Sequence, residues 1–154
     1  MMEPSGKRQI KVTGVIFTVY GVYNLVCVVL LLAGVKAAYQ LFYTDGIEQH
    51  LAGNPSMVLI MTAVASLIGA GIYLTAGIVG IRLCGRLEKA KVLRNIGMIM
   101  FIFTLLGLVG NLFSGSPIFW TVLFNGVEAI LWFSYYLGGK KNLDDFKKMD
   151  LTLG

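Results

Sequence analysis

The chain has 154 residues, of which 56% are hydrophobic and only 14% carry a charge. A soluble domain has about 25% charged residues, so this composition argues against a soluble enzyme or a soluble binding domain. The net charge of +5 does not indicate a nucleic-acid-binding protein. The basic residues flank long apolar segments, where membrane topology already explains them.

Four apolar segments are long enough, or nearly so, to cross a bilayer as helices. About 20 apolar residues span the ~30 Å hydrocarbon core. Glu128 is the only formally charged residue inside the four segments. The sequence therefore predicts an all-α, polytopic membrane protein, a single domain forming an antiparallel four-helix transmembrane bundle. The expected spans are about 12–35, 57–81, 96–113 and 118–137.

The basic residues predict the orientation of these spans. All but Lys36 of the 13 Lys and Arg residues fall on one side of the membrane when the four spans are threaded in order. The positive-inside rule then places both termini in the cytoplasm of a multi-pass cell-membrane protein. An external loop at 36–56, a cytoplasmic loop at 82–94 and a cytoplasmic tail at 138–154 follow. The first segment exceeds the ~7–15 residues of a signal-peptide core, so we expect a retained span.

Helix boundaries can be predicted from local signals. Asn54 and Pro55 are typical of the residue before a helix and of its first residue, because proline lacks an N–H that would be unpaired there. Gly85 is expected to end the second helix, and residues 87–91 to begin the third before it enters the membrane. The first 11 residues are expected to form a short polar arm. Two interpretations of the tail stay open, an amphipathic helix on the inner leaflet and a frayed end.

The second span is rich in small residues, which predicts close helix packing. Ala65 with Gly69, and Ala76 with Gly80, form two small-xxx-small pairs. Such pairs allow helix backbones to approach closely in lipid. They favour a central position in the bundle, and they fit homo-oligomerisation or association with another membrane protein equally well.

Glu128 is expected near the middle of the fourth span, where a charge costs about 2.5–3.5 kcal/mol on insertion scales. Depth alone suggests that Asn24, Tyr73, Thr104 and Asn125 join it in one polar pocket. One interpretation is structural, with a neutral carboxyl that hydrogen-bonds between helices. The other is a proton- or cation-coupled binding site. We favour the structural interpretation, because no second charged residue accompanies Glu128 in the spans.

The remaining candidates carry little chemistry. The cytoplasmic loop is basic, and we favour a topogenic role for it over binding of lipid headgroups. No metal site is expected from His50 or from the two isolated cysteines, Cys27 and Cys84. No catalytic or cofactor-binding motif is present, so we expect neither an enzyme nor a cofactor. The basic loop residues are Arg82, Arg86, Lys89, Lys91 and Arg94.

The segment from Ala76 to Lys91, AGIVGIRLCGRLEKAK, resembles small uncharacterised four-span proteins of anaerobic Gram-positive bacteria. In those proteins a similar glycine-rich segment closes the second helix and an E-K-A-K-like run leads into the third. The resemblance implies a bacterial four-span membrane protein and carries no assigned activity. The expected function is that of an accessory or scaffold subunit acting through helix–helix contacts. The alternative is a small proton- or cation-coupled transporter that uses Glu128.

Overall fold

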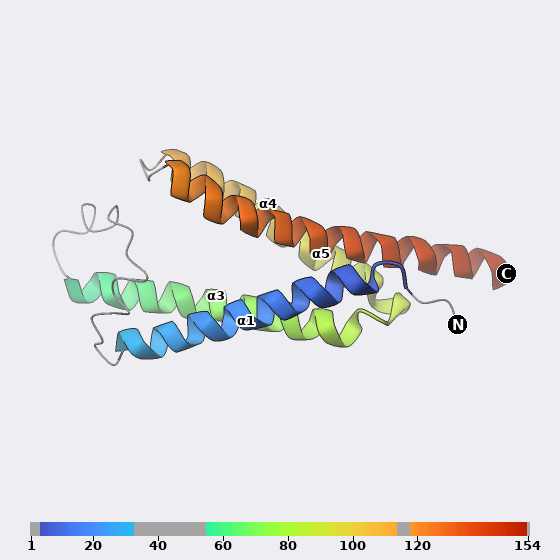
Figure 1. Ribbon diagram of the computed structural model, residues 1–154, viewed down its shortest axis with the longest axis horizontal. Helices are drawn as coiled ribbons and strands as arrows, with labels where there is room; N and C mark the ends of the chain where they lie inside the picture. Colours follow the sequence, from blue (N-terminus) through green and yellow to red (C-terminus); the bar gives the residue numbers. More distant parts are fainter. Residues whose placement is uncertain (1–3, 33–54, 114–117, 154) are drawn as a thin grey trace. The chain divides into compact units, whose positions relative to one another are not determined.

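The computed structural model describes residues 4–32, 55–113 and 118–153, and these residues are almost entirely helical. They form α1 (Lys7–Leu32), α3 (Pro55–Leu83), a short 3₁₀ turn (Leu87–Lys89), α4 (Ala90–Phe113) and α5 (Ile118–Leu153), as Figure 1 shows. The predicted all-helical fold class is therefore confirmed. The chain divides into two compact units, residues 1–17 with 76–154 and residues 18–75, so α1 and α3 contribute to both.

Three of the helical segments are long and apolar enough to cross a membrane: Lys7–Leu30, Ile60–Leu83 and Leu87–Phe113. The fourth expected span, in α5, is not among them within the described residues. For the first three segments, the capacity to cross a membrane follows from length and composition alone.

The boundaries of α3 and α4 follow the local signals. The structure begins α3 at Pro55 and ends it at Leu83, one residue before the turn that contains Gly85. The 3₁₀ turn then leads directly into α4, as predicted for residues 87–91. The predicted external loop up to residue 54, including His50, lies outside the described residues. So do the end of the first predicted span and residues 114–117.

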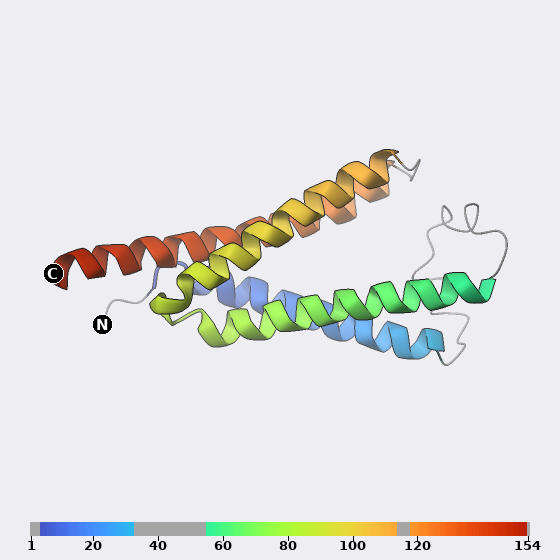
Figure 2. The same cartoon turned by 180° about the vertical axis from the view of Figure 1, so that it is seen from behind.

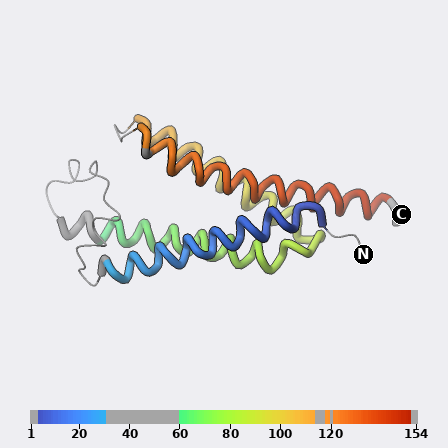
Figure 3. The backbone as a smooth tube through the Cα atoms, viewed as in Figure 1, coloured from blue at the N-terminus to red at the C-terminus, as the bar shows by residue number. Residues whose placement is uncertain are grey.

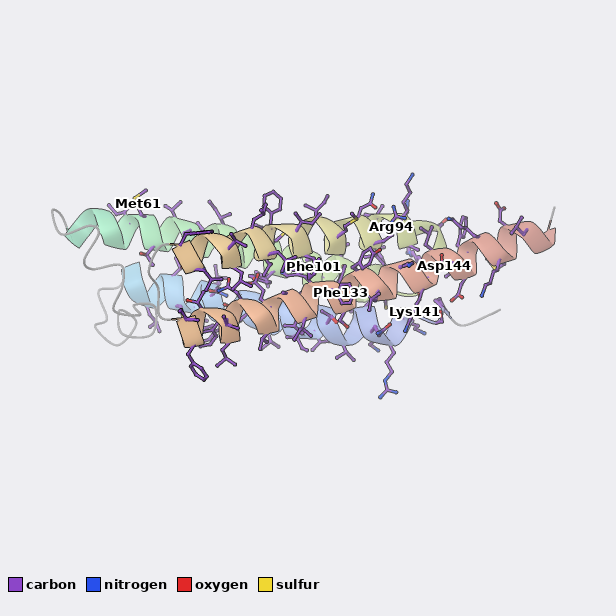
Figure 4. All side chains as sticks on the ribbon, turned by 90° about the horizontal axis from the view of Figure 1, so that it is seen from above. Met61, Arg94, Phe101, Phe133, Lys141 and Asp144 are labelled. Carbon is purple, nitrogen blue, oxygen red and sulfur yellow. The ribbon has the colours of Figure 1, made fainter. Side chains whose placement is uncertain are left out.

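The helices α4 and α5 form a hairpin in which they run side by side along most of α4 (Figure 2). Glycine makes this close approach possible at two levels. A Cβ at Gly97 would lie 2.6 Å from the backbone nitrogen of Tyr136, and one at Gly139 would lie 2.5 Å from that of Arg94. Farther from the start of α4, the rings of Phe101 and Phe133 lie against each other with centroids 5.3 Å apart (Figure 4).

The buried side of α5 repeats at intervals of three and four residues, from Ala129 through Trp132, Tyr135 and Gly139 to Asn142. On α4 the same intervals separate Ala90, Leu93 and Gly97, and buried Thr104 lies seven residues, or two intervals, farther on. A repeat of about 3.5 residues on two neighbouring helices is typical of coiled-coil-like packing at a small crossing angle.

The first turns of α1 and the last turns of α3 complete this unit. Phe17 stacks on Trp132 with ring centroids 4.0 Å apart, and both rings are almost fully buried. A Cβ at Gly14 would lie 3.0 Å from the carbonyl oxygen of Gly77, so α1 and α3 also approach closely here. These contacts place residue 14 of α1 at the level of residue 77 of α3.

The second unit contains the remainder of α1 and α3. Tyr20 meets Tyr73 edge to face, with ring centroids 4.8 Å apart. A Cβ at Gly21 would lie 2.9 Å from the backbone nitrogen of Leu74, which marks another close approach of the two helices.

Two features at the chain ends differ from expectation. α1 already begins at Lys7, inside what was expected to be a polar arm. α5 does not stop near residue 137 but continues as one helix to Leu153, as Figure 3 traces. Its 36 residues are about 54 Å long at 1.5 Å per residue, well beyond the ~30 Å hydrocarbon core. The last turns of α5 extend past the start of α4 (Figure 1).

The glycine contacts predict how the hairpin responds to an added methyl group. Gly97→Ala places a Cβ against the backbone of Tyr136, which cannot rotate away, so we expect a loss of about 1–3 kcal/mol in stability. Gly107→Ala is the matched control on the same helix, because a Cβ there meets no described atom within 4 Å. It should be neutral or stabilising by at most about 1 kcal/mol.

Unfolding of the detergent-solubilised variants in increasing SDS measures this difference. Equal stability of the two variants would contradict the close approach of α4 and α5 at Gly97.

Candidate functional site

The half-buried carboxyl of Glu128 lies in the α4–α5 hairpin. Its Oε1 accepts hydrogen bonds from Thr104 Oγ1 on α4 and from Trp132 Nε1 on α5, both at 3.3 Å. Both distances are long for hydrogen bonds of these types. Thr104 Oγ1 also lies 3.0 Å from the carbonyl oxygen of Met100 in its own helix. The carboxyl therefore forms a loose polar link between α4 and α5.

The pairing of Glu128 with Thr104 is the part of the expected polar pocket that the structure brings together. Asn125 is on the same helix, but its amide donates to the carbonyl oxygen of Thr121 at 2.9 Å, within α5. Asn24 and Tyr73 belong to the other unit. There, Asn24 donates to the carbonyl oxygen of Tyr20, at 2.9 Å. Convergence of all five residues on one pocket stays a prediction.

The two small-residue pairs of α3 have different surroundings. Gly80 faces the ring of Tyr135, whose hydroxyl would lie 2.9 Å from a Cβ at this position. The same hydroxyl donates to the carbonyl oxygen of Ala76 at 3.1 Å. Ala65 is exposed, and a Cβ at Gly69 meets no described atom within 4 Å. One pair thus packs within the chain, and the other makes no such contact among the described residues.

A second polar cluster, which the sequence did not suggest, ties three segments together at the end of the hairpin where α4 begins. The side chain of Asn142 on α5 is 0% exposed. Its Oδ1 accepts from the backbone N–H of Gly6 at 2.7 Å, and its Nδ2 donates to the carbonyl oxygen of Cys84 at 3.0 Å. Asn142 therefore satisfies backbone groups at the start of α1 and just beyond the end of α3, where helices leave such groups unpaired.

Asp145 extends this cluster by one helical turn. Its Oδ2 accepts from both the backbone N–H and the hydroxyl of Ser5, at 2.8 and 2.6 Å. These hydrogen bonds, assisted by the positive charge of Lys148, hold the pKa of the Asp145 carboxyl below its usual range. The anionic carboxylate also lies near the N-terminus of α1, where the helix dipole favours negative charge. We call Ser5, Gly6, Cys84, Asn142 and Asp145 the terminal tie.

The spacing of Asn142 and Asp145, three residues apart in a helical stretch, is the one sequence signal for the terminal tie. It places the two side chains on the same helical face. Apart from the Ser5 hydroxyl, their partners are backbone groups, which carry no side-chain signature, so the pairing could not be read from the sequence.

The basic loop residues lie near the terminal tie. Arg82, Arg86, Lys89 and Lys91 are exposed. Arg94 is half-buried, and its guanidinium donates to Asn95 Oδ1 on the same helix. Across the ranges 4–32, 55–113 and 118–153, no group of three or more His, Cys, Asp or Glu residues is placed to hold a metal ion.

Comparisons with protein-family models, with curated proteins and with solved structures find no match for this chain.

The geometry of the terminal tie predicts a large effect of a single substitution. Asn142→Leu keeps the branching and the number of side-chain heavy atoms but leaves the Gly6 N–H and the Cys84 carbonyl without their partner. Each buried group left unpaired costs about 1–3 kcal/mol, so unfolding in SDS should begin at clearly lower denaturant. Asn95→Leu is the matched control, because the Asn95 side chain is exposed and its Oδ1 accepts from the guanidinium of its neighbour Arg94.

Asn95→Leu should change stability by less than about 0.5 kcal/mol. If Asn142→Leu were equally mild, the terminal tie would not hold the three segments together.

Proposed function

We propose that this protein is an integral membrane protein with four spans and cytoplasmic termini, which acts as an accessory or scaffold subunit through helix–helix contacts. The surface of its helices supports membrane insertion. Large apolar side chains are exposed along α1, α3, α4 and α5, and Phe113 is 88% exposed. A soluble monomer rarely exposes apolar surface over such lengths, whereas lipid covers it without cost.

The packing of the hairpin supports insertion of α5 as well. α5 follows α4 from the contact of Gly139 with Arg94 to that of Glu128 with Thr104. A bilayer crossed by α4 must then also contain this part of α5. Eleven residues separate Glu128 from Gly139, about 16 Å along the helix, which is roughly half the hydrocarbon thickness.

The observation that carries the scaffold proposal is the use of Glu128 as a link between helices. The one carboxyl in the expected spans accepts from a side chain on each helix of the hairpin. Interhelical hydrogen bonds of this kind contribute on average about 0.6 kcal/mol in membrane proteins, a structural contribution. The open Ala65–Gly69 pair on α3 offers a surface for association with a second copy or another membrane protein.

Substitution of Gly69 tests the association. Gly69→Leu should weaken self-association in mild detergent, because the bulky side chain separates helices that pack through small residues. Gly71→Leu is the matched control on the same helix, at a position about 200° around the axis that is also free of described atoms within 4 Å. Analytical ultracentrifugation or cross-linking measures the association. A purely monomeric wild type, or equal effects of the two variants, would contradict the proposal for this surface.

The alternative function is a small proton- or cation-coupled transporter. It is favoured by the partial exposure of Glu128, since a carboxyl in lipid binds protons and cations competitively. Glu128→Gln keeps the shape and an acceptor oxygen but cannot ionise. For a scaffold we expect unchanged folding and assembly and no proton or cation flux in wild-type proteoliposomes. A wild-type flux that Glu128→Gln abolishes would favour the transporter and overturn the scaffold proposal.

A further inference from the structure

We infer that the end of the protein that carries the terminal tie binds the headgroups of anionic phospholipids through a belt of exposed cations. The inference rests on the membrane insertion proposed above and goes beyond it by naming the lipid class. We call this set the basic belt, which consists of Arg8, Lys11, Arg82, Lys91, Lys140 and Lys141.

Contacts within one unit place these cations at a common level. Asn142 bonds to Gly6 and Cys84, so the first residue before α1 and the residue after α3 lie level with it. One turn deeper, Gly138 contacts Ile10 and Gly139 contacts Arg94. Each cation of the basic belt is within three residues of one of these anchors on its own helix, hence within about 5 Å along the axis. Figure 4 shows Arg94 and Lys141 at the same end of the two helices.

The exposed surface changes from apolar to basic at this level. On α1, exposed Val12, Val15 and Ile16 follow directly after exposed Lys11. On α3, exposed Ile78 precedes exposed Arg82 by one turn, so both lie on one side of the helix. Long basic side chains at such a boundary keep their apolar stems in lipid and place their charges among the headgroups.

The balance of charge selects an anionic partner. Near the basic belt, the acidic residues of the described chain are Glu88, Asp144 and Asp145, and Asp145 is already held by Ser5. The excess of cations matches the phosphates of a negatively charged inner leaflet, where each surface Lys or Arg strengthens binding by up to roughly fivefold. The positive-inside rule accounts for the positive charge of these residues. It does not require that all four helices expose a cation at the same level.

The tail of α5 provides an internal control. Lys147 and Lys148 are also exposed, but Lys147 lies six residues beyond Lys141, the last cation of the basic belt, which is about 9 Å farther along the helix. This exceeds the Debye length of about 8 Å at physiological ionic strength, so the two tail lysines should contribute little to headgroup binding.

Electron paramagnetic resonance of spin-labelled lipids tests the inference. The purified full chain is reconstituted in phosphatidylcholine vesicles that contain trace spin-labelled phosphatidylglycerol or phosphatidylcholine in both leaflets, so that orientation does not affect the result. We expect the motionally restricted layer to prefer phosphatidylglycerol by at least about twofold, and the preference to fall in high salt. Lys91→Gln with Lys140→Gln should reduce the preference towards one, whereas Lys147→Gln with Lys148→Gln should retain it.

The outcomes separate this inference from the proposed function. A chain that does not float with the vesicles after alkaline washing overturns both. A chain that is inserted but restricts the two lipids equally, or that loses its preference equally in both double variants, overturns the basic belt alone. Restoration of the preference by Lys91→Arg with Lys140→Arg would support charge as the cause, and failure of this restoration would count against it.

Discussion

The buried side chain of Asn142 is the interaction on which the arrangement of one unit depends. A helix leaves its first N–H groups and its last carbonyl groups without partners, and a buried end needs substitutes. Asn142 offers both an acceptor and a donor, so one amide serves Gly6 before α1 and Cys84 after α3. The position of α5 thereby fixes where two other helices begin and end. Few other side chains could do this, because a carboxylate lacks the donor and an ammonium lacks the acceptor.

Glu128 forms a weaker connection than the terminal tie does, and it lies farther from the start of α4. The difference is visible in the lengths of the hydrogen bonds. The terminal tie has two contacts of 2.6 and 2.7 Å, whereas the contacts of Glu128 are 3.3 Å long. Long contacts of this kind contribute less to stability than the short contacts of the terminal tie. The proposed scaffold role needs Glu128 only as a hydrogen-bond acceptor, whereas the alternative transporter role needs a carboxyl that can ionise.

The sequence predicts much of the helical architecture, because apolar length, Pro55 and Gly85 are local signals. It predicts the association of Thr104 with Glu128 from depth alone. It does not predict the terminal tie, and it leaves residues 138–153 open between a helix and a frayed end, of which the structure has the helix. The buried positions of α5 include Thr121, Gly139 and Asn142, while many exposed positions are apolar. Polarity alone therefore does not identify the buried face, as expected for helices whose exposed side would face lipid in the proposed membrane setting.

The location of the terminal tie explains why the side chain of Asn142 is so tightly enclosed. Asn142 lies level with the basic belt, where, in the proposed membrane orientation, water and headgroups would compete for backbone N–H and carbonyl groups. An exposed amide would only exchange hydrogen bonds to water for hydrogen bonds to the backbone. Its net contribution to stability would be about 1 kcal/mol or less. Complete burial by the glycines of α5 and the first turns of α1 removes that competition. The close packing at Gly138 and Gly139 and the polar tie beyond them therefore act together, because the packing excludes the water that would otherwise weaken the tie.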